Sequence, residues 1–277
     1  MTGHQIIKYL NASGIRNSST WIEEANFGFR YVTKKIANLK SDSRILEVGC
    51  GTGILLSMLS EDFPNHSFHG VEPLGDGFAD FHEINLLSRE LGAQIKEASY
   101  EELEIKEKYD LIFCVNALEH VDDWRDLIRW SSINLKNGGS FFSLCPNYGF
   151  PYESHFNIPI IWNKKLTYRI FKKHIKDVER ESNAGGLWDS LNFIRKSEVK
   201  KFIKAEANSL NISVYDDLTI MEDMVERLMT DAAFRKRQRV VGKIATIMKK
   251  IGVFGMIRWV PNHAPYMSLT VAKDDGK

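Results

Sequence analysis

The segment that decides the fold is Arg44–Gly53, which reads RILEVGCGTG. Its first five residues form a short apolar run typical of a buried strand, and helical apolar spacing follows over residues 54–59. Between the two lie Gly49, Gly51 and Gly53. Glycine suits a loop that approaches a ligand closely, because it has no Cβ and tolerates positive φ. The segment therefore predicts a strand, a tight loop and a helix, with a ligand at the loop.

Strands and helices continue to alternate after this segment. Residues 109–115 (YDLIFCV) have the apolar character of a strand buried on both faces, and residues 136–139 (KNGG) have turn chemistry. Such alternation implies βαβ units with right-handed crossovers and a parallel sheet covered on both faces. The other expected strands are 67–71, 94–98, 140–144, 212–215 and 266–271, and the other expected helices are 80–91, 124–135 and 197–210, the last with Ser197 as N-cap.

The fold class we predict is α/β: a Rossmann-like, seven-stranded, mostly parallel sheet with helices on both faces and helical lid inserts. A chain of 277 residues allows one decorated domain or two small ones, and we expect a single domain. Its expected parts are an N-terminal helical cap (1–40), a cofactor-binding core (41–146), a lid insert (147–196), further core (197–217), a basic helical insert (218–264), and the last strand and tail (265–277).

The glycine spacing excludes two other nucleotide sites. A dinucleotide fingerprint has glycines at its first, third and sixth positions, but the sixth position counted from Gly49 is Ile54. A phosphate-binding P-loop requires Gly-Lys-Ser or Gly-Lys-Thr, which does not follow the loop. A nucleotide-binding oxidoreductase stays as a rival that failure to bind NAD would remove.

The glycine segment resembles the first motif of class I S-adenosylmethionine-dependent methyltransferases. The segment NALEHV (116–121) after the strand at 109–115, and the later LKNGG (135–139), resemble the small-molecule branch that includes ubiquinone-pathway O-methyltransferases. The resemblance covers roughly residues 40–147. It implies S-adenosylmethionine as cofactor and S-adenosylhomocysteine as product.

The same resemblance implies the cofactor-binding residues. Glu47 before the loop suits the amino-acid end and sulfonium of this cofactor, and Glu72 at the end of the second strand is expected to accept the ribose hydroxyls. Ser99 stands where the family usually has an acidic residue beside the adenine. The remaining candidates are Gly49, Cys50, Gly51, Gly53, Pro73, Tyr100, Asn116, Ala117 and Leu118.

The catalytic residues are expected after the fifth strand, at the carboxyl edge of the sheet where α/β folds bind ligands. His155 in the loop 146–157 is our preferred general base, because imidazole titrates near neutral pH; a structural hydrogen bond is the alternative role. His120 is the second catalytic candidate. We expect the aromatic side chains Phe150, Tyr152, Trp162 and Trp188 to exclude water and to stack on the acceptor.

A divalent metal is an alternative that we do not adopt from the sequence. Some relatives of this fold hold a cation with a Glu-His dipeptide, a further acidic residue and a histidine. Here Asn116 occupies the earlier acidic position, which leaves Glu119, His120 and His155. We therefore assign no metal ligand, and Glu119 has the alternative of supporting a helix N-terminus.

Composition bounds the partners and the compartment. With 43% apolar and 26% charged residues the chain is typical of a folded domain, and its net charge of +1 gives no reason to expect nucleic acid. Three widely spaced cysteines, Cys50, Cys114 and Cys145, indicate buried reduced thiols and a cytoplasmic location.

The stretch 234–260 is wholly basic, with eight cations and no acidic residue. It suits peripheral contact with an anionic membrane, whereas packing on the main domain is the alternative. We predict methyl transfer to a small-molecule acceptor at a hydroxyl oxygen of a sugar, aromatic or lipid-linked metabolite. An N-methyltransferase and a non-catalytic S-adenosylmethionine-binding protein are the alternatives, and the sequence leaves the oligomeric state open.

Overall fold

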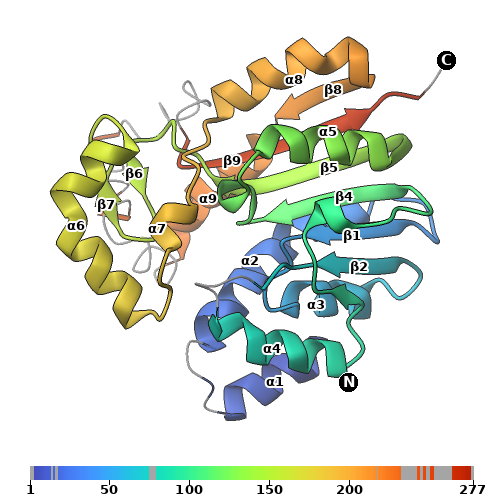
Figure 1. The fold of residues 1–277 in the computed structure, drawn as a ribbon, viewed down its shortest axis with the longest axis horizontal. Coiled ribbons are helices and arrows are strands. Elements are labelled where there is room, and N and C mark those ends of the chain that lie inside the picture. Colours follow the sequence, from blue (N-terminus) through green and yellow to red (C-terminus); the bar gives the residue numbers. More distant parts are fainter. Residues whose placement is uncertain are drawn as a thin grey trace.

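A seven-stranded sheet forms the centre of the computed structural model, in the order β3-β2-β1-β4-β5-β9-β8 (Figure 1). The structure describes residues 3–13, 15, 18–74, 79–216, 218–231, 242–243, 246–247, 250–252 and 264–275. The strands of the sheet are β1 (Arg44–Val48), β2 (Ser67–Val71), β3 (Ile95–Lys96), β4 (Tyr109–Val115), β5 (Leu135–Pro146), β8 (Ile212–Asp216) and β9 (Tyr266–Lys273).

Strand direction places one set of strand ends at the functional edge. β1 pairs in parallel with β2 and with β4, and β4 pairs in parallel with β5. β9 runs antiparallel to both of its neighbours, β5 and β8. The carboxyl ends of β1, β2, β4 and β5 therefore meet at one edge, together with the start of β9. The predicted fold class, a mostly parallel Rossmann-like sheet, is confirmed.

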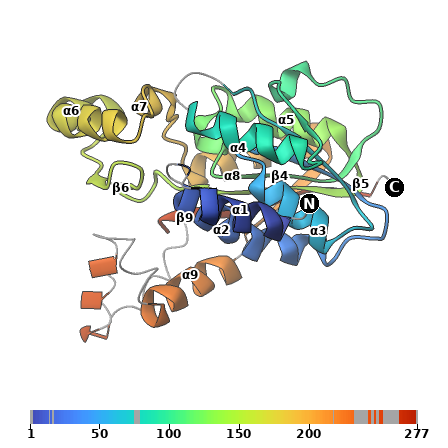
Figure 2. The same ribbon diagram turned by 90° about the horizontal axis from the view of Figure 1, so that it is seen from below.

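Helices cover both faces of the sheet. In Figure 2, α1, α2 and α3 lie below the sheet and α5 and α8 above it. The helices over these faces are α1 (Gly3–Ser13), α2 (Ser18–Ile36), α3 (Ile54–Asp62), α4 (Ala79–Glu90), α5 (Trp124–Asn134), α8 (Lys196–Leu210) and α9 (Leu218–Thr230), and two 3-10 turns are η1 (Tyr100–Glu102) and η2 (Leu118–His120).

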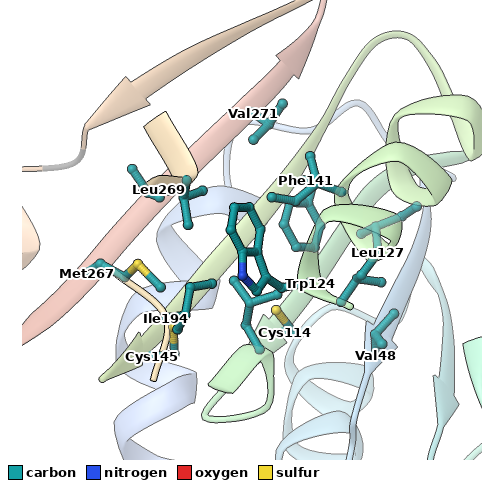
Figure 3. Packing of buried hydrophobic residues seen from close by; sticks show 14 of the residues in the cluster. Val48, Cys114, Trp124, Leu127, Phe141, Cys145, Ile194, Met267, Leu269 and Val271 are labelled. Atoms are coloured by element: carbon teal, nitrogen blue, oxygen red, sulfur yellow. The ribbon is translucent and has the colours of Figure 1, made fainter. Parts of the chain in front are cut away.

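Alternation along β4 divides the apolar core between the two faces. Ile112 and Cys114 join the cluster under α5 and α8, whereas Leu111 and Phe113 join the cluster with α1, α2 and α3. Figure 3 shows the first cluster, with Trp124 of α5 at its centre beside Cys114. Both strand faces are covered, which explains the continuous apolar run.

The lid insert is more regular than its composition indicated. It contains the short hairpin β6 (Tyr152–Glu153) and β7 (Ile158–Pro159), followed by α6 (Lys164–Glu181) and α7 (Leu187–Ser190). α6 has eighteen residues. In Figure 1 these elements stand together beside the sheet.

Three local expectations need correction. Residues 136–139 belong to β5, but the pairing with β4 shifts there from Tyr109–Leu135 to Leu111–Ser140, so their turn chemistry makes a bulge. α8 begins at Lys196 with Arg195 as N-cap, and Ser197 lies inside the helix. The third strand is shorter than the expected 94–98: β3 contains only Ile95 and Lys96, and residues 97–99 connect it to η1 without strand structure.

Two further expectations concern the cysteines and the basic stretch. All three cysteines are buried and free, as expected. Most of the basic stretch 234–260 lies outside the described residues, so its predicted helical face is not tested. No helix in the described part of the chain has both the length and the low polarity needed to cross a bilayer.

Candidate functional site

The glycine loop between β1 and α3 is tightly packed as well as specially shaped. Gly49, Gly51 and Gly53 have φ values of 73°, 51° and 74°, which favour glycine. A Cβ on Gly49 would lie 2.5 Å from the Cβ of Ala117, and one on Gly53 would lie 2.4 Å from Cδ1 of Ile95. The loop is therefore glycine-rich because both its backbone conformation and its neighbours exclude side chains.

Hydrogen bonds from neighbouring elements hold the loop. The backbone N–H groups of Gly49 and Cys50 donate to the Val71 carbonyl at 2.9 and 3.1 Å. Asn85 of α4 donates from Nδ2 to the Gly51 carbonyl at 2.7 Å, and the Ser88 hydroxyl donates to the Thr52 carbonyl at 2.8 Å. Sequence reasoning missed Asn85 and Ser88. Their only signal in the sequence is that they are polar residues on the buried face of a helix.

Two buried carboxyl groups lie under the loop. Oε2 of Glu72 accepts the backbone N–H of Gly51 at 2.8 Å. Burial raises the pKa of Glu72, against the backbone donors Gly51 and Leu74. Glu47 is 2% exposed, and its Oε2 has no hydrogen-bond partner among the described residues. Burial, and then the charge of Glu72, hold the pKa of Glu47 well above its usual range. An unsatisfied buried oxygen at this place fits a ligand that donates a hydrogen bond.

The other cofactor candidates differ in burial and in the direction of their side chains. Ser99 precedes η1, and its backbone N–H donates to Glu102. The Tyr100 hydroxyl donates to Asp126 of α5, and its ring packs against Trp130, so this side chain is turned into the core. Pro73 is exposed and Cys50 is buried.

The turn after β4 brings its candidates beside the loop. Asn116 has φ 50°, its backbone N–H donates to the Leu144 carbonyl, and its buried Oδ1 has no described partner. Ala117 forms the close approach to Gly49, whereas Leu118 is fully buried in the core. This turn then continues into Glu119 and His120.

Glu119, His120 and His155 come together although they belong to distant segments. One ligand atom of each lies within 4.8 Å of the others, and the two imidazole ring centres are 5.5 Å apart. η2 supplies Glu119 and His120, and the hairpin loop after β6 supplies His155. The structure thus brings both catalytic candidates to the sheet edge beside the glycine loop.

Both histidines are held through Nδ1. Nδ1 of His155 lies 2.6 Å from Oε1 of Glu153, a carboxylate with no exposed surface. Nδ1 of His120 lies 2.8 Å from the Ser190 hydroxyl, which donates its own proton to the Leu187 carbonyl. Because Ser190 must then accept, the proton of a neutral His120 is on Nδ1 and the lone pair is on Nε2. Sequence reasoning missed Glu153 and Ser190 as orienting groups.

The two imidazoles differ in charge. Burial opposes a charge on His155, but Glu153, Glu119 and Glu24 outweigh it and raise the pKa of His155 to about 9. Burial, and then the charges of His155 and Lys164, lower the pKa of His120 to about 3. At neutral pH the site therefore holds a cationic His155 beside a neutral His120.

Two further carboxyl groups complete the electrostatics. Burial raises the pKa of Glu119 to about 7, although His155 opposes the shift. Glu24 of α2 keeps accessible surface, yet desolvation by the surrounding protein raises its pKa to about 7 against His155. Nothing in the sequence marked Glu24, because it lies on an ordinary amphipathic helix more than a hundred residues before His155.

The cluster could also hold a metal ion. Both carboxylate oxygens of Glu119 are buried and without a hydrogen-bond partner in the described part of the chain. Hydrogen bonds on Nδ1 are the usual way in which proteins orient histidines that bind metal through Nε2. Two imidazoles and one carboxylate fit a divalent cation such as Zn²⁺.

The aromatic residues of the lid divide between its inside and its outside. Trp188 is 2% exposed and packs against Phe156 and Phe193 within the insert. The Tyr152 hydroxyl donates to Asn157, and Phe150 is partly buried. Trp162 is 86% exposed. The expectation that Trp162 and Trp188 line the acceptor site is therefore wrong, because one faces bulk solvent and the other fills the core of the insert.

Comparison with known proteins agrees with this geometry. The family model described as a methyltransferase domain matches residues 23–187. An uncharacterized protein of Mycobacterium tuberculosis (strain ATCC 25618 / H37Rv) is 32% identical over 256 residues, which cover 90% of this chain and 85% of that protein. A ubiquinone biosynthesis O-methyltransferase of Escherichia coli O7:K1 (strain IAI39 / ExPEC) is 29% identical over 116 residues, or 40% of this chain and 46% of that enzyme.

A solved structure supports the fold. The phosphoethanolamine N-methyltransferase 2 of Haemonchus contortus, in complex with phosphomonomethylethanolamine and S-adenosylhomocysteine, matches with a TM-score of 0.50 and 15% identity over 90% of this chain and 52% of that chain. A Rossmann-like sheet with a glycine loop over two buried carboxyl groups defines an enzyme of the methyltransferase class. The chain belongs to the methyltransferase-domain family, and the resemblance inferred from the glycine loop is confirmed.

Proposed function

We propose that this protein transfers a methyl group from S-adenosylmethionine to a hydroxyl oxygen of a small molecule. One observation carries the proposal: the glycine loop and the His155–Glu153 pair meet at the same edge of the sheet. Gly49 packs against Ala117, and two residues later the chain reaches Glu119, which clusters with His155. A cofactor at the loop and an acceptor at His155 would then be neighbours.

The residues present fit this cofactor. When bound, S-adenosylmethionine supplies an electrophilic methyl group on a sulfonium. Glu72 would accept hydrogen bonds from the ribose hydroxyls, and the orphaned oxygen of Glu47 offers an acceptor beneath the loop. The backbone N–H of Gly51 already donates a hydrogen bond to Glu72 and so stabilises its carboxylate form.

His155 is the proposed general base. The acceptor oxygen must lose its proton as it bonds to the methyl carbon, and Nε2 of His155 would take this proton while Glu153 stabilises the imidazolium. With a pKa of about 9, only about 1% of His155 is unprotonated at pH 7. We therefore expect kcat/KM to rise with pH until about pH 9. His120, which stays neutral, would orient the acceptor by a hydrogen bond.

The experiment begins with calorimetry of S-adenosylhomocysteine binding to the wild type and to Glu72→Ala. We expect binding that weakens at least tenfold in the variant. Failure to detect binding even at millimolar S-adenosylhomocysteine would refute the cofactor assignment. A panel of hydroxyl-bearing and amine-bearing acceptors, with the methylated atom located by NMR, then tests oxygen against nitrogen; methylation of amines alone would overturn oxygen transfer.

His155→Ala tests the base. We expect turnover to fall about 10²-fold or more with unchanged cofactor affinity, because only proton transfer is removed. Turnover that is unchanged rules out the role, and turnover that is absent in wild type and variant across the whole panel favours a protein that binds the cofactor without catalysis.

A metal-assisted form of the same reaction is favoured by the orphaned carboxylate of Glu119. Glu119, His120 and His155 would hold the ion, which would supply Lewis-acid polarisation of the acceptor hydroxyl. Calorimetric titration of the chelator-treated protein with Zn²⁺ tests this form. We expect binding that is lost in Glu119→Gln; a wild type that binds no ion would leave the metal-free form.

A further inference from the structure

The outer side of α6 carries apolar side chains that the fold does not bury. Trp162, Leu166 and Ile170 are 86%, 38% and 55% exposed. Leu166 and Ile170 are neighbours on the helix surface because they are four residues apart, and Trp162 lies just before the N-cap Asn163. Single exposed apolar residues are ordinary, but a row of this kind marks an interaction surface.

Trp162 is held outward by a hydrogen-bonded turn. Its φ is 62°, a conformation that is rare for bulky side chains and persists only where the surroundings impose it. On either side, the backbone N–H of Ile161 donates to the Thr167 hydroxyl at 2.8 Å, and Oδ1 of Asn163 accepts the backbone N–H of Leu166 at 2.9 Å. The exposed indole therefore belongs to an ordered turn that starts the helix.

Unpaired cations surround this apolar row. Lys176 pairs with Glu179, and Arg180 pairs with Asp177. Four other exposed cations of α6 form no ion pair with any residue that the structure describes. These are Lys165, Arg169, Lys172 and Lys173.

The inner side of α6 connects this surface to the site. Thr167 and Ile175 are fully buried, and Nε2 of His174 lies 2.8 Å from the carbonyl oxygen of Phe156, the residue after His155. Figure 1 and Figure 2 both show α6 at the outer end of the molecule, away from the helices that cover the sheet. Among the described elements, those of the sheet and its covering helices therefore leave this surface uncovered, and the inner side of α6 attaches it to the lid.

We propose that the outer side of α6 docks the lid onto a membrane surface containing anionic phospholipid. A tryptophan suits the headgroup region, aliphatic side chains reach the acyl boundary, and lysine and arginine are attracted to anionic headgroups. A second copy of the chain fits worse, because a two-fold contact would place the same four cations against themselves. Nucleic acid would satisfy the cations but leave Trp162 and Ile170 without an apolar partner.

The proposal does not depend on the proposed reaction. Flotation with phosphatidylcholine vesicles, with and without 30% phosphatidylglycerol, measures it directly. We expect the wild type to bind the anionic vesicles and to be released by salt, and each lost cation to weaken partitioning roughly fivefold.

Two pairs of variants separate the apolar and the ionic parts. Ile170→Ser should weaken vesicle binding several-fold, whereas Ile133→Ser on α5, where the side chain is 56% exposed, should not. The double variant Arg169→Glu with Lys173→Glu should abolish it, and an equal charge reversal at residues 201 and 204, exposed lysines of α8, should have a much smaller effect.

Binding of S-adenosylhomocysteine by each variant shows whether it is folded and keeps this test separate from that of the reaction. Absence of wild-type binding to anionic vesicles contradicts the proposal. So does binding that the α6 variants and their controls weaken equally. A change of molar mass in light scattering with Ile170→Ser, without a change in flotation, assigns the surface to a second copy and also overturns it.

Discussion

Replacing Gly49 by alanine should damage this protein in two separable ways. The φ of 73° costs an alanine about 1–2 kcal/mol relative to glycine. The new Cβ would also lie 2.5 Å from the Cβ of Ala117, far inside the ordinary contact distance, and relief of such overpacking costs about 1–3 kcal/mol. The expected loss is therefore about 2–5 kcal/mol of the free energy of unfolding. This is a large share of the stability of about 5–15 kcal/mol that is typical of a domain.

Two other glycines provide matched controls. Gly186 has φ 90° with no atom within 4 Å of an added Cβ, so its alanine variant should lose only the conformational part, about 1–2 kcal/mol. Gly185 has open space and no left-handed φ, so Gly185→Ala should change stability by less than about 0.5 kcal/mol.

Urea unfolding at one temperature, with the slope shared among the variants, measures these differences. Calorimetry of S-adenosylhomocysteine binding should in addition show weakened affinity for Gly49→Ala alone, because only that loop must move away from Ala117. If Gly49→Ala lowers the free energy of unfolding by no more than Gly186→Ala does, the loop does not pack tightly against the turn after β4, and the packing argument fails.

Three further predictions concern hydrogen bonds and charge. Burial opposes ionisation of Asp216, but Lys200 and Lys196 hold its pKa below the ordinary 3.8, so the carboxylate stabilises the fold above that pH and loses this contribution as pH falls through its folded pKa. The difference in unfolding free energy between wild type and Asp216→Asn should therefore shrink on acidification. A difference that grows contradicts the ion pair. In chelator-treated protein, Glu153→Gln should lower the pKa of His155 from about 9 toward 6.5, which NMR titration measures. An unchanged pKa would show that Glu153 is not the main partner of His155. Asn85→Ala leaves the carbonyl of the partly buried Gly51 without its 2.7 Å donor and should lower the free energy of unfolding in urea by about 0.5–1.5 kcal/mol, whereas a neutral effect means that another donor replaces it.

The local pattern was sufficient for the core of the fold. β1, β2 and β4 have the bounds expected from the sequence, because a buried parallel strand is recognised by its own apolar run and by the glycine or turn that ends it. The glycine loop followed in the same way, since Gly49, Gly51 and Gly53 lie within five consecutive residues and their backbone conformation is a local property.

The sequence was less informative in the lid. Helical lid inserts were expected, but the bounds of α6 were not, because its lysine-rich exposed face and the aromatic residues around it gave no clear apolar stripe. Trp162 was expected at the acceptor, and only the turn formed by Ile161, Asn163 and Thr167 shows that the indole points outward.

By itself, then, the sequence determined a Rossmann-like methyltransferase core, its glycine loop and the two acidic residues at the carboxyl ends of the first two strands. The tertiary structure alone decided the polar cluster. Glu24, Glu119, Glu153 and His155 come from α2, η2 and the lid hairpin, and their pKa values depend on one another and on burial. Chain periodicity encodes contacts between residues a few positions apart, whereas the charge state of His155 depends on carboxylates that only folding brings within reach.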